Sequence, residues 1–99
     1  MSKLSNTQKR HLKGLAHDLK TVVMIGDKGL TQPVFEEIKI ALEAHELIKI
    51  GIRADTKEDR NQIIDNIVNR THAAKVQTIG GKLVIFKPSK DEKIAIPKK

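Results

Sequence analysis

The sequence predicts an α/β domain: a compact, mixed four-stranded sheet packed with helices, in the order α-β-α-β-α-β-β. Apolar residues recur at helical spacing in three segments, short β-rich runs alternate with these segments, and two glycines join the last two runs. Strands separated by helices pair in parallel through right-handed crossovers, and the final hairpin adds an antiparallel strand. A chain of 99 residues can build one core but not two, so we expect a single domain over residues 1–99.

The first helix is predicted over residues 5–19. Leu12, Leu15 and Leu19 fall on one stripe at helical spacing and are expected to face the core. Residues 22–25 form an apolar run that is too short for a helix. This run predicts a strand that is buried on both faces and pairs in parallel.

A second helix is predicted to begin near Thr31, after a turn at residues 26–29. Thr31 is a suitable N-cap, and Pro33 fits the first turn, where its missing N–H costs little. The side chains expected on the buried face of this helix are Val34, Phe35, Ile38, Ala41, Leu42 and His45. His45 is therefore expected to be a packed, hydrogen-bonded core histidine.

Residues 47–53 alternate in polarity, which predicts a strand. The three isoleucines at positions 48, 50 and 52 share one face, and Lys49 lies on the wetter opposite face, so helices are expected mainly on one side of the sheet. Thr56 is expected to cap a third helix. Isoleucine and valine side chains at positions 63, 64, 67 and 68 form its buried stripe, and the helix should end near residues 70–72.

Two strands are predicted at residues 75–79 and 82–87, with Gly80 and Gly81 between them. Two glycines in that position favour a type I′ turn, which requires positive φ at both central residues. The chain from about residue 88 is rich in lysine and interrupted by prolines. We expect this tail to be irregular.

The formal net charge is +7, and its distribution points to a polyanionic partner. Residues 1–20 carry five basic residues and one acidic residue, and residues 73–99 carry seven lysines and two acidic residues. The middle of the chain is nearly neutral. If the two ends meet in space, they will form a positive surface.

Several function classes lack their residues in this sequence. There is no cysteine, no nucleophile elbow, no nucleotide-binding P-loop and no metal-ligand cluster, and the four histidines are scattered. No apolar run has the length of a signal peptide core or a membrane span. We expect a cytoplasmic protein that is not an enzyme, with no metal, no cofactor, no small-molecule substrate and no membrane partner.

The candidate binding element is the turn formed by Gly26, Asp27, Lys28 and Gly29. Two glycines at this spacing often mark only a turn. This turn, however, lies between a strand and a helix N-terminus, where backbone amides and the helix dipole favour a phosphate, and Lys28 adds a positive charge. Asp27 would repel a phosphate unless its carboxylate points away.

The aromatic content indicates how a nucleic acid would be bound. The only aromatic residues other than histidine are Phe35 and Phe86, and domains that stack bases on a sheet need exposed aromatic side chains. Contacts with phosphates and with RNA shape are expected instead. The basic residues that would make these contacts are Lys9, Arg10 and Lys13 on the first helix and Lys75 and Lys82 on the hairpin.

Four segments of the sequence resemble the CRM domain family (chloroplast RNA splicing and ribosome maturation), most closely its stand-alone bacterial YhbY-like members. They are Leu4-Ser5 with Gln8-Lys9-Arg10 and Leu12-Lys13, then Ile25-Gly26-Asp27-Lys28-Gly29-Leu30-Thr31, then Ala44-His45-Glu46-Leu47-Ile48-Lys49-Ile50, and finally Val76-Gln77-Thr78-Ile79-Gly80 with Leu83-Val84-Ile85-Phe86-Lys87-Pro88. The resemblance implies a fold similar to the C-terminal domain of a bacterial translation initiation factor.

The resemblance also implies a function, which is binding to large-subunit ribosomal RNA in precursor particles during ribosome assembly. In the family the glycine loop and the neighbouring basic surface are the proposed contacts. Here these correspond to residues 26–29 and the basic side of the first helix. The protein is expected to act as a monomer. The alternative is a factor that docks on a ribosomal protein and has incidental affinity for RNA.

Overall fold

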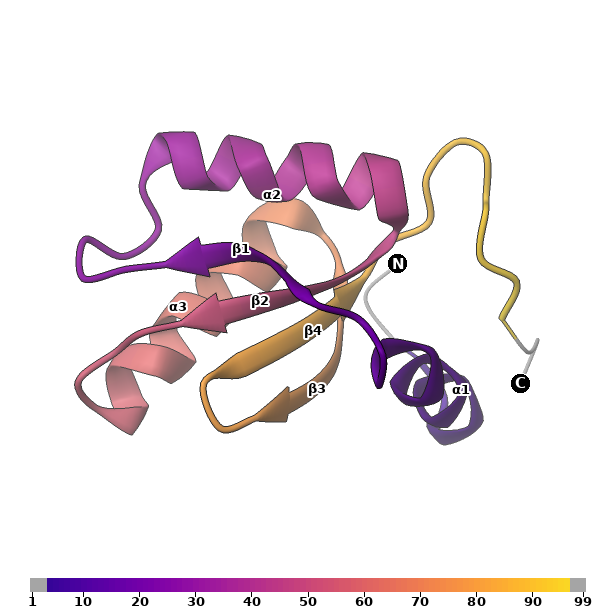
Figure 1. The fold of residues 1–99 in the computed structure, drawn as a ribbon, viewed down its shortest axis with the longest axis horizontal. Coiled ribbons are helices and arrows are strands. Elements are labelled where there is room, and N and C mark those ends of the chain that lie inside the picture. The colour runs from indigo at the N-terminus through magenta and orange to yellow at the C-terminus, as the bar shows by residue number, and fades with distance from the viewer. Residues whose placement is uncertain (1–3, 97–99) are drawn as a thin grey trace.

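The computed structural model describes residues 4–96 and contains three helices and four strands within that range (Figure 1). The elements are α1 (Asn6–Ala16), β1 (Thr21–Ile25), α2 (Gln32–His45), β2 (Leu47–Ile52), α3 (Lys57–Thr71), β3 (Ala74–Ile79) and β4 (Lys82–Phe86). This is the predicted order.

The four strands form one mixed sheet in the spatial order β1-β2-β4-β3. Strand β1 pairs with β2 in parallel, and β4 pairs antiparallel with both β2 and β3. The predicted fold class is therefore confirmed. Because β1 and β2 are parallel, the loops that follow them leave the sheet at the same edge.

The sheet separates two apolar clusters, and the alternation in β2 distributes residues between them. Ile48, Ile50 and Ile52 pack with residues of α2 and α3 on one face. On the other face Leu47 packs with Leu12 and other residues beneath α1. Two of the three helices thus lie on one side of the sheet, and α1 covers part of the other side.

Side-chain caps define where the helices begin. Ser5 and Gln8 form a reciprocal capping box at the start of α1. The Thr31 hydroxyl accepts a hydrogen bond from the N–H of Val34, and the Thr56 hydroxyl accepts one from the N–H of Asp59. The predicted starts near Thr31 and Thr56 are both confirmed. Helix α1 is shorter than predicted: it ends at Ala16 and does not reach residue 19.

Three burial predictions are wrong. Strand β1 is an edge strand with one open face, so Val22 is 48% exposed and Met24 is 61% exposed. Leu15 is 44% exposed, because α1 buries the side of the helix that carries Leu12. His45 is exposed at the end of α2, where the helix stops before its apolar stripe could continue.

The turn between β3 and β4 also differs from the prediction. Of its two glycines only Gly80 has a positive φ, of 54°. A type I′ turn requires positive φ at both positions, whereas a type II′ turn requires it only at the first. The backbone N–H of Ile52 donates to the carbonyl of Gly81, which ties this turn to the end of β2.

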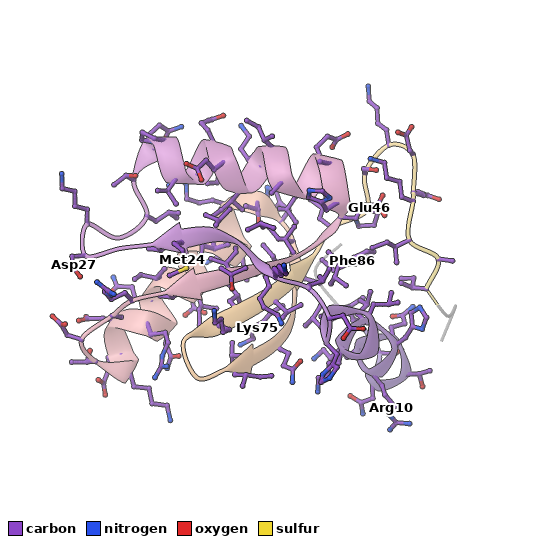
Figure 2. All side chains as sticks on the ribbon, viewed as in Figure 1. Arg10, Met24, Asp27, Glu46, Lys75 and Phe86 are labelled. Carbon is purple, nitrogen blue, oxygen red and sulfur yellow. The ribbon has the colours of Figure 1, made fainter. Side chains whose placement is uncertain are left out.

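A buried carboxylate fixes the chain that follows β4. Glu46 is 0% exposed, and its side chain accepts hydrogen bonds from the backbone N–H groups of Ser89, Lys93 and Ile94 and from the Ser89 hydroxyl (Figure 2). Residues 87–96 contain no helix or strand. They are nevertheless held in place, and Ile94 packs against the cluster beneath α1.

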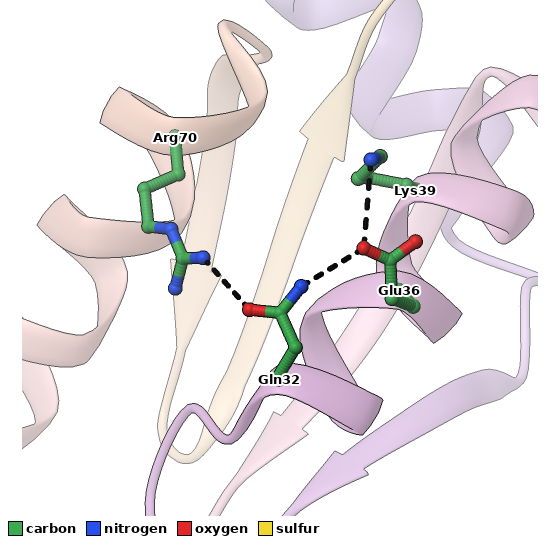
Figure 3. A network of polar contacts seen from close by, with 4 residues as sticks. All are labelled: Gln32, Glu36, Lys39 and Arg70. Atoms are coloured by element: carbon green, nitrogen blue, oxygen red, sulfur yellow. Dashed lines mark hydrogen bonds and ion pairs between the residues drawn. The ribbon is translucent and has the colours of Figure 1, made fainter.

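Helices α2 and α3 are joined at the surface by Arg70 (Figure 3). Its guanidinium lies 3.9 Å from the centre of the Phe35 ring and donates to the side-chain carbonyl of Gln32 at 3.4 Å. The Gln32 amide in turn donates to Glu36, which also pairs with Lys39. These contacts link α3 to α2 on the surface of the protein.

Candidate nucleic-acid interface

The Gly26–Gly29 loop is a tight turn that projects from one end of the molecule (Figure 1). The N–H of Gly29 donates to the carbonyl of Gly26 at 3.0 Å, and the N–H of Thr31 donates to the carbonyl of Gly29 at 3.0 Å. Asp27 and Lys28 occupy the two central positions of the turn, and both are exposed. The turn therefore presents these two residues at its tip.

The two glycines of the loop have different physical roles. Gly29 has a φ of 74°, which lies in the region that favours glycine. Gly26 has no positive φ, and a Cβ added to it would meet no atom within 4 Å. The backbone conformation accounts for Gly29, but neither conformation nor packing requires a glycine at position 26.

The turn also offers hydrogen-bond donors. Within residues 4–96, the backbone N–H groups of Asp27 and Lys28 donate to no protein acceptor. At the start of α2, the Thr31 hydroxyl accepts from Val34, so one donor of the helix end is already satisfied. The donors available to a ligand therefore lie at the tip of the turn as well as at the helix.

A hollow of about 560 Å³ lies beside the loop. Arg53 lines it because β1 and β2 end at the same edge of the sheet, and the N–H of Arg53 donates to the carbonyl of Ile25 at 2.9 Å. The lining also includes three carboxylates, those of Asp27, Asp55 and Asp59. The hollow is therefore mixed in charge, and Asp27 itself is at the far tip of the molecule (Figure 2).

The predicted basic residues do not form a single surface. Helix α1 lies at the end of the molecule opposite the loop, along a longest dimension of 37 Å (Figure 1). Lys9 and Arg10 on α1 are therefore remote from Lys28. Arg10 points outward at that distant end (Figure 2).

The structure brings together Lys13 of α1 and Lys82 of β4. Both line a second hollow, of about 240 Å³, together with Lys49 of β2. Lys75 pairs with Ile85 across the β3–β4 ladder and does not line this hollow. Of the five predicted basic residues on α1 and the hairpin, only Lys13 and Lys82 are thus neighbours in the same hollow.

Lys49 and Arg53 were missed as candidate residues. Both lie on the wetter face of the alternating strand at residues 47–53, and that alternation is a usable signal. A basic residue that alternates with buried isoleucines is held at a defined place on the sheet.

Two further classes of site find no support in the described part of the chain. No group of three or more His, Cys, Asp or Glu side chains is placed to hold a metal ion. Among residues 4–96, no helix has the length and apolar character needed to cross a bilayer.

Comparison with known proteins identifies the family. Residues 4–87 match the CRS1 / YhbY (CRM) domain. Over the full length of both chains, the protein is 50% identical to a Haemophilus influenzae protein named RNA-binding protein. It is 37% identical to a Bacillus subtilis protein named Probable RNA-binding protein YqeI, covering 91% of this chain and 94% of that one.

A solved structure shares the fold. It is the solution structure of a Staphylococcus aureus protein described as a candidate RNA binding protein, with a TM-score of 0.82 and 31% identity. The match covers 96% of this chain and all of that one. The chain therefore belongs to the CRS1 / YhbY (CRM) domain family.

Proposed function

We propose that this protein binds RNA, and that its target is large-subunit ribosomal RNA in precursor particles during ribosome assembly. Membership of the CRM domain family and the names of its relatives support RNA binding. The net charge of +7 supports a polyanionic partner. The assignment to precursor particles rests on the resemblance to the stand-alone bacterial members of the family.

Gly26 is the observation that carries the proposal. The fold gives no internal reason for a glycine at this exposed position. A glycine is useful there if another backbone must approach closely from outside. A phosphate at the tip of the turn would meet the N–H groups of Asp27 and Lys28, the Lys28 ammonium and the positive end of the α2 dipole.

The expected mode of binding is electrostatic. Phe35 and Phe86 are both buried, so neither offers a stacking surface for bases. Contacts to the RNA backbone would give strong dependence on salt and little reading of sequence by the loop. We further propose that the protein acts in the cytoplasm as a monomer, without enzymatic activity or a cofactor.

Sedimentation tests the ribosomal role. Cell extract is fractionated on a sucrose gradient, and the protein is located by immunoblotting. Its position is compared with the positions of precursor and mature subunits. We expect it to sediment with large-subunit precursors, and ultraviolet crosslinking of that fraction should join it to large-subunit RNA. Sedimentation only at the top of the gradient would contradict the assembly role.

A protein-docking role is the second candidate. An apolar hollow of about 410 Å³ lies between α1, β1 and the tail, and the exposed side chains of Leu15 and Val22 contribute to its lining. Such a surface could receive an apolar side chain of a ribosomal protein. Salt separates the two roles, because a phosphate-dominated complex weakens steeply as salt rises and an apolar contact does not.

A further inference from the structure

The hollow of about 240 Å³ that is lined by Lys13, Lys49 and Lys82, which we call the α1 hollow, lies where α1 ends above an uncovered part of the sheet. Helix α1 stops at Ala16, so the sheet beyond its last turn carries no helix on this face. Strands β2, β3 and β4 form the floor, and the last turn of α1 forms one wall. The lining residues are Lys13, Ala16, His17, Lys49, Gln77, Ile79, Lys82 and Val84.

The charge of this hollow is more favourable to an anion than the charge beside the glycine loop. Three lysines line it, and none of the described lining residues is acidic. The hollow beside the loop combines Lys28 and Arg53 with three aspartates. Electrostatic complementarity to a phosphate is therefore stronger at the α1 hollow.

The lysines are not neutralised within the protein. The only ion pair in the described range joins Lys39 and Glu36 on α2. Lys82 donates to the Thr21 hydroxyl at 2.9 Å, and Lys49 is half-buried yet has no hydrogen-bond acceptor or carboxylate partner among residues 4–96. An ammonium without a partner inside the protein is available to an external anion.

The floor of the hollow adds features that a phosphate alone would not need. Ile79 is 59% exposed at its margin, and the amide of the half-buried Gln77 offers both a donor and an acceptor. An exposed apolar side chain together with an amide suits a nucleobase that has been released from its stack. The volume is below the roughly 300–1,000 Å³ of typical small-molecule sites, which favours part of a polymer over a whole metabolite.

From these features we infer that the α1 hollow receives one unpaired nucleotide of the bound RNA. The base lies against Ile79 with an edge at the Gln77 amide, and the three lysines hold the adjoining phosphates. The inference rests on the proposed RNA binding and adds a preference for RNA with unpaired nucleotides.

The position of the hollow is compatible with a contact to the same RNA that binds the loop. The Lys82–Thr21 hydrogen bond places it beside the first residue of β1, and the loop follows the last residue of that strand. The strand from Thr21 to Gly26 spans about 17 Å at 3.3 Å per residue. Met24, which is 61% exposed, lies on β1 between the two sites.

Two RNA probes test this inference: a fully paired hairpin, and the same hairpin with a bulge of three unpaired uridines. Affinities are measured by fluorescence anisotropy. We expect the protein to bind the bulged RNA roughly tenfold more tightly, because the paired RNA would lack about one charge-assisted contact that the bulged RNA makes. The Lys49→Gln/Lys82→Gln double variant should lose this preference.

Two further variants separate charge from base contact. Lys75→Gln/Lys90→Gln removes the same charge outside the hollow, and it should change the two affinities by the same factor, so that the preference for the bulged RNA is kept. Gln77→Leu leaves the charge unchanged, and it should reduce the preference without altering affinity for the paired hairpin. Each variant is first checked for an unchanged melting temperature.

The outcomes are distinguishable. Equal affinity of the unaltered protein for the two RNAs, or an intact preference in the Lys49→Gln/Lys82→Gln and Gln77→Leu variants, would overturn the inference while leaving RNA binding in place. Failure to bind either RNA at low salt would contradict the proposed function itself.

Discussion

The carboxylate of Glu46 accepts two hydrogen bonds from Ser89, one from its backbone N–H at 2.8 Å and one from its hydroxyl at 2.6 Å. The N–H groups of Lys93 and Ile94 complete the set at 2.9 and 2.7 Å. Glu46 itself has a φ of 65°, which is uncommon for a residue with a side chain. This conformation ends α2 and turns the carboxylate toward the tail.

The protein should lose stability in acid through Glu46. Burial raises the pKa of this carboxyl, but the four hydrogen bonds outweigh burial and lower the pKa from 4.5 to about 2. Because the folded pKa lies below the unfolded value, the stabilisation is complete above pH 4.5 and disappears as pH falls toward 2. The shift corresponds to about 3 kcal/mol of unfolding free energy.

Urea unfolding of the Glu46→Gln variant tests the stabilisation by the ionised Glu46 carboxylate. We expect a loss of about 2–4 kcal/mol at pH 7, because the amide N–H₂ would face a backbone donor and the charge-assisted bonds would weaken. The difference in unfolding free energy between the variant and the unaltered protein should become smaller as the pH falls from about 4.5 to about 2. A difference that stays constant over this range would contradict the role of the charge.

The two loop glycines should respond differently to substitution. Gly29→Ala is expected to lower the unfolding free energy by about 1 kcal/mol, since its φ is unfavourable for an L-residue. Gly26→Ala and Gly26→Val should leave the melting temperature nearly unchanged, because the added atoms enter open space. Thermal unfolding of the three variants measures both effects.

RNA affinity should follow side-chain size at position 26. We expect Gly26→Val to weaken binding to ribosomal RNA more than Gly26→Ala, because the larger side chain keeps the phosphate farther from the turn. Filter binding at constant salt provides the comparison. Equal affinity for all three proteins would mean that the glycine is not needed for access.

Asp27 should oppose binding. Its carboxylate lies at the tip of the turn beside the proposed phosphate position, and no ion pair neutralises it within residues 4–96. Asp27→Asn is expected to raise RNA affinity by about twofold to fivefold at low salt, the range of an exposed charge interaction. A loss of affinity would instead indicate that the carboxylate accepts a hydrogen bond from the RNA.

The sequence was sufficient to predict features that depend on local pattern. Thr31 and Thr56 signal the helix starts through capping chemistry, and the alternation around Ile50 defines the two faces of β2. Strand β1 was misjudged because an apolar run does not reveal whether its strand is central or at an edge. The exposure of Met24 follows from the order of strands in the sheet, which the local pattern does not specify.

The features that depend on distant segments could not be predicted. The donors to Glu46 come from residues 43 to 48 positions later in the chain, and a glutamate after a helix is ordinarily exposed. The meeting of Lys13, Lys49 and Lys82 depends on where α1 ends above the sheet. Local spacing also gave no indication that the loop and α1 occupy opposite ends of the molecule.

The salt dependence of RNA binding tests the central claim most directly. The dissociation constant for a large-subunit RNA transcript is measured over a range of potassium chloride concentrations for three proteins: unaltered, Lys28→Gln and Lys90→Gln. Lys90 is exposed on the tail and serves as the charge-matched control. We predict a steep slope of log K against log salt that Lys28→Gln reduces by about 1 and Lys90→Gln leaves unchanged. Equal slopes for the two variants would contradict a phosphate contact at the glycine loop.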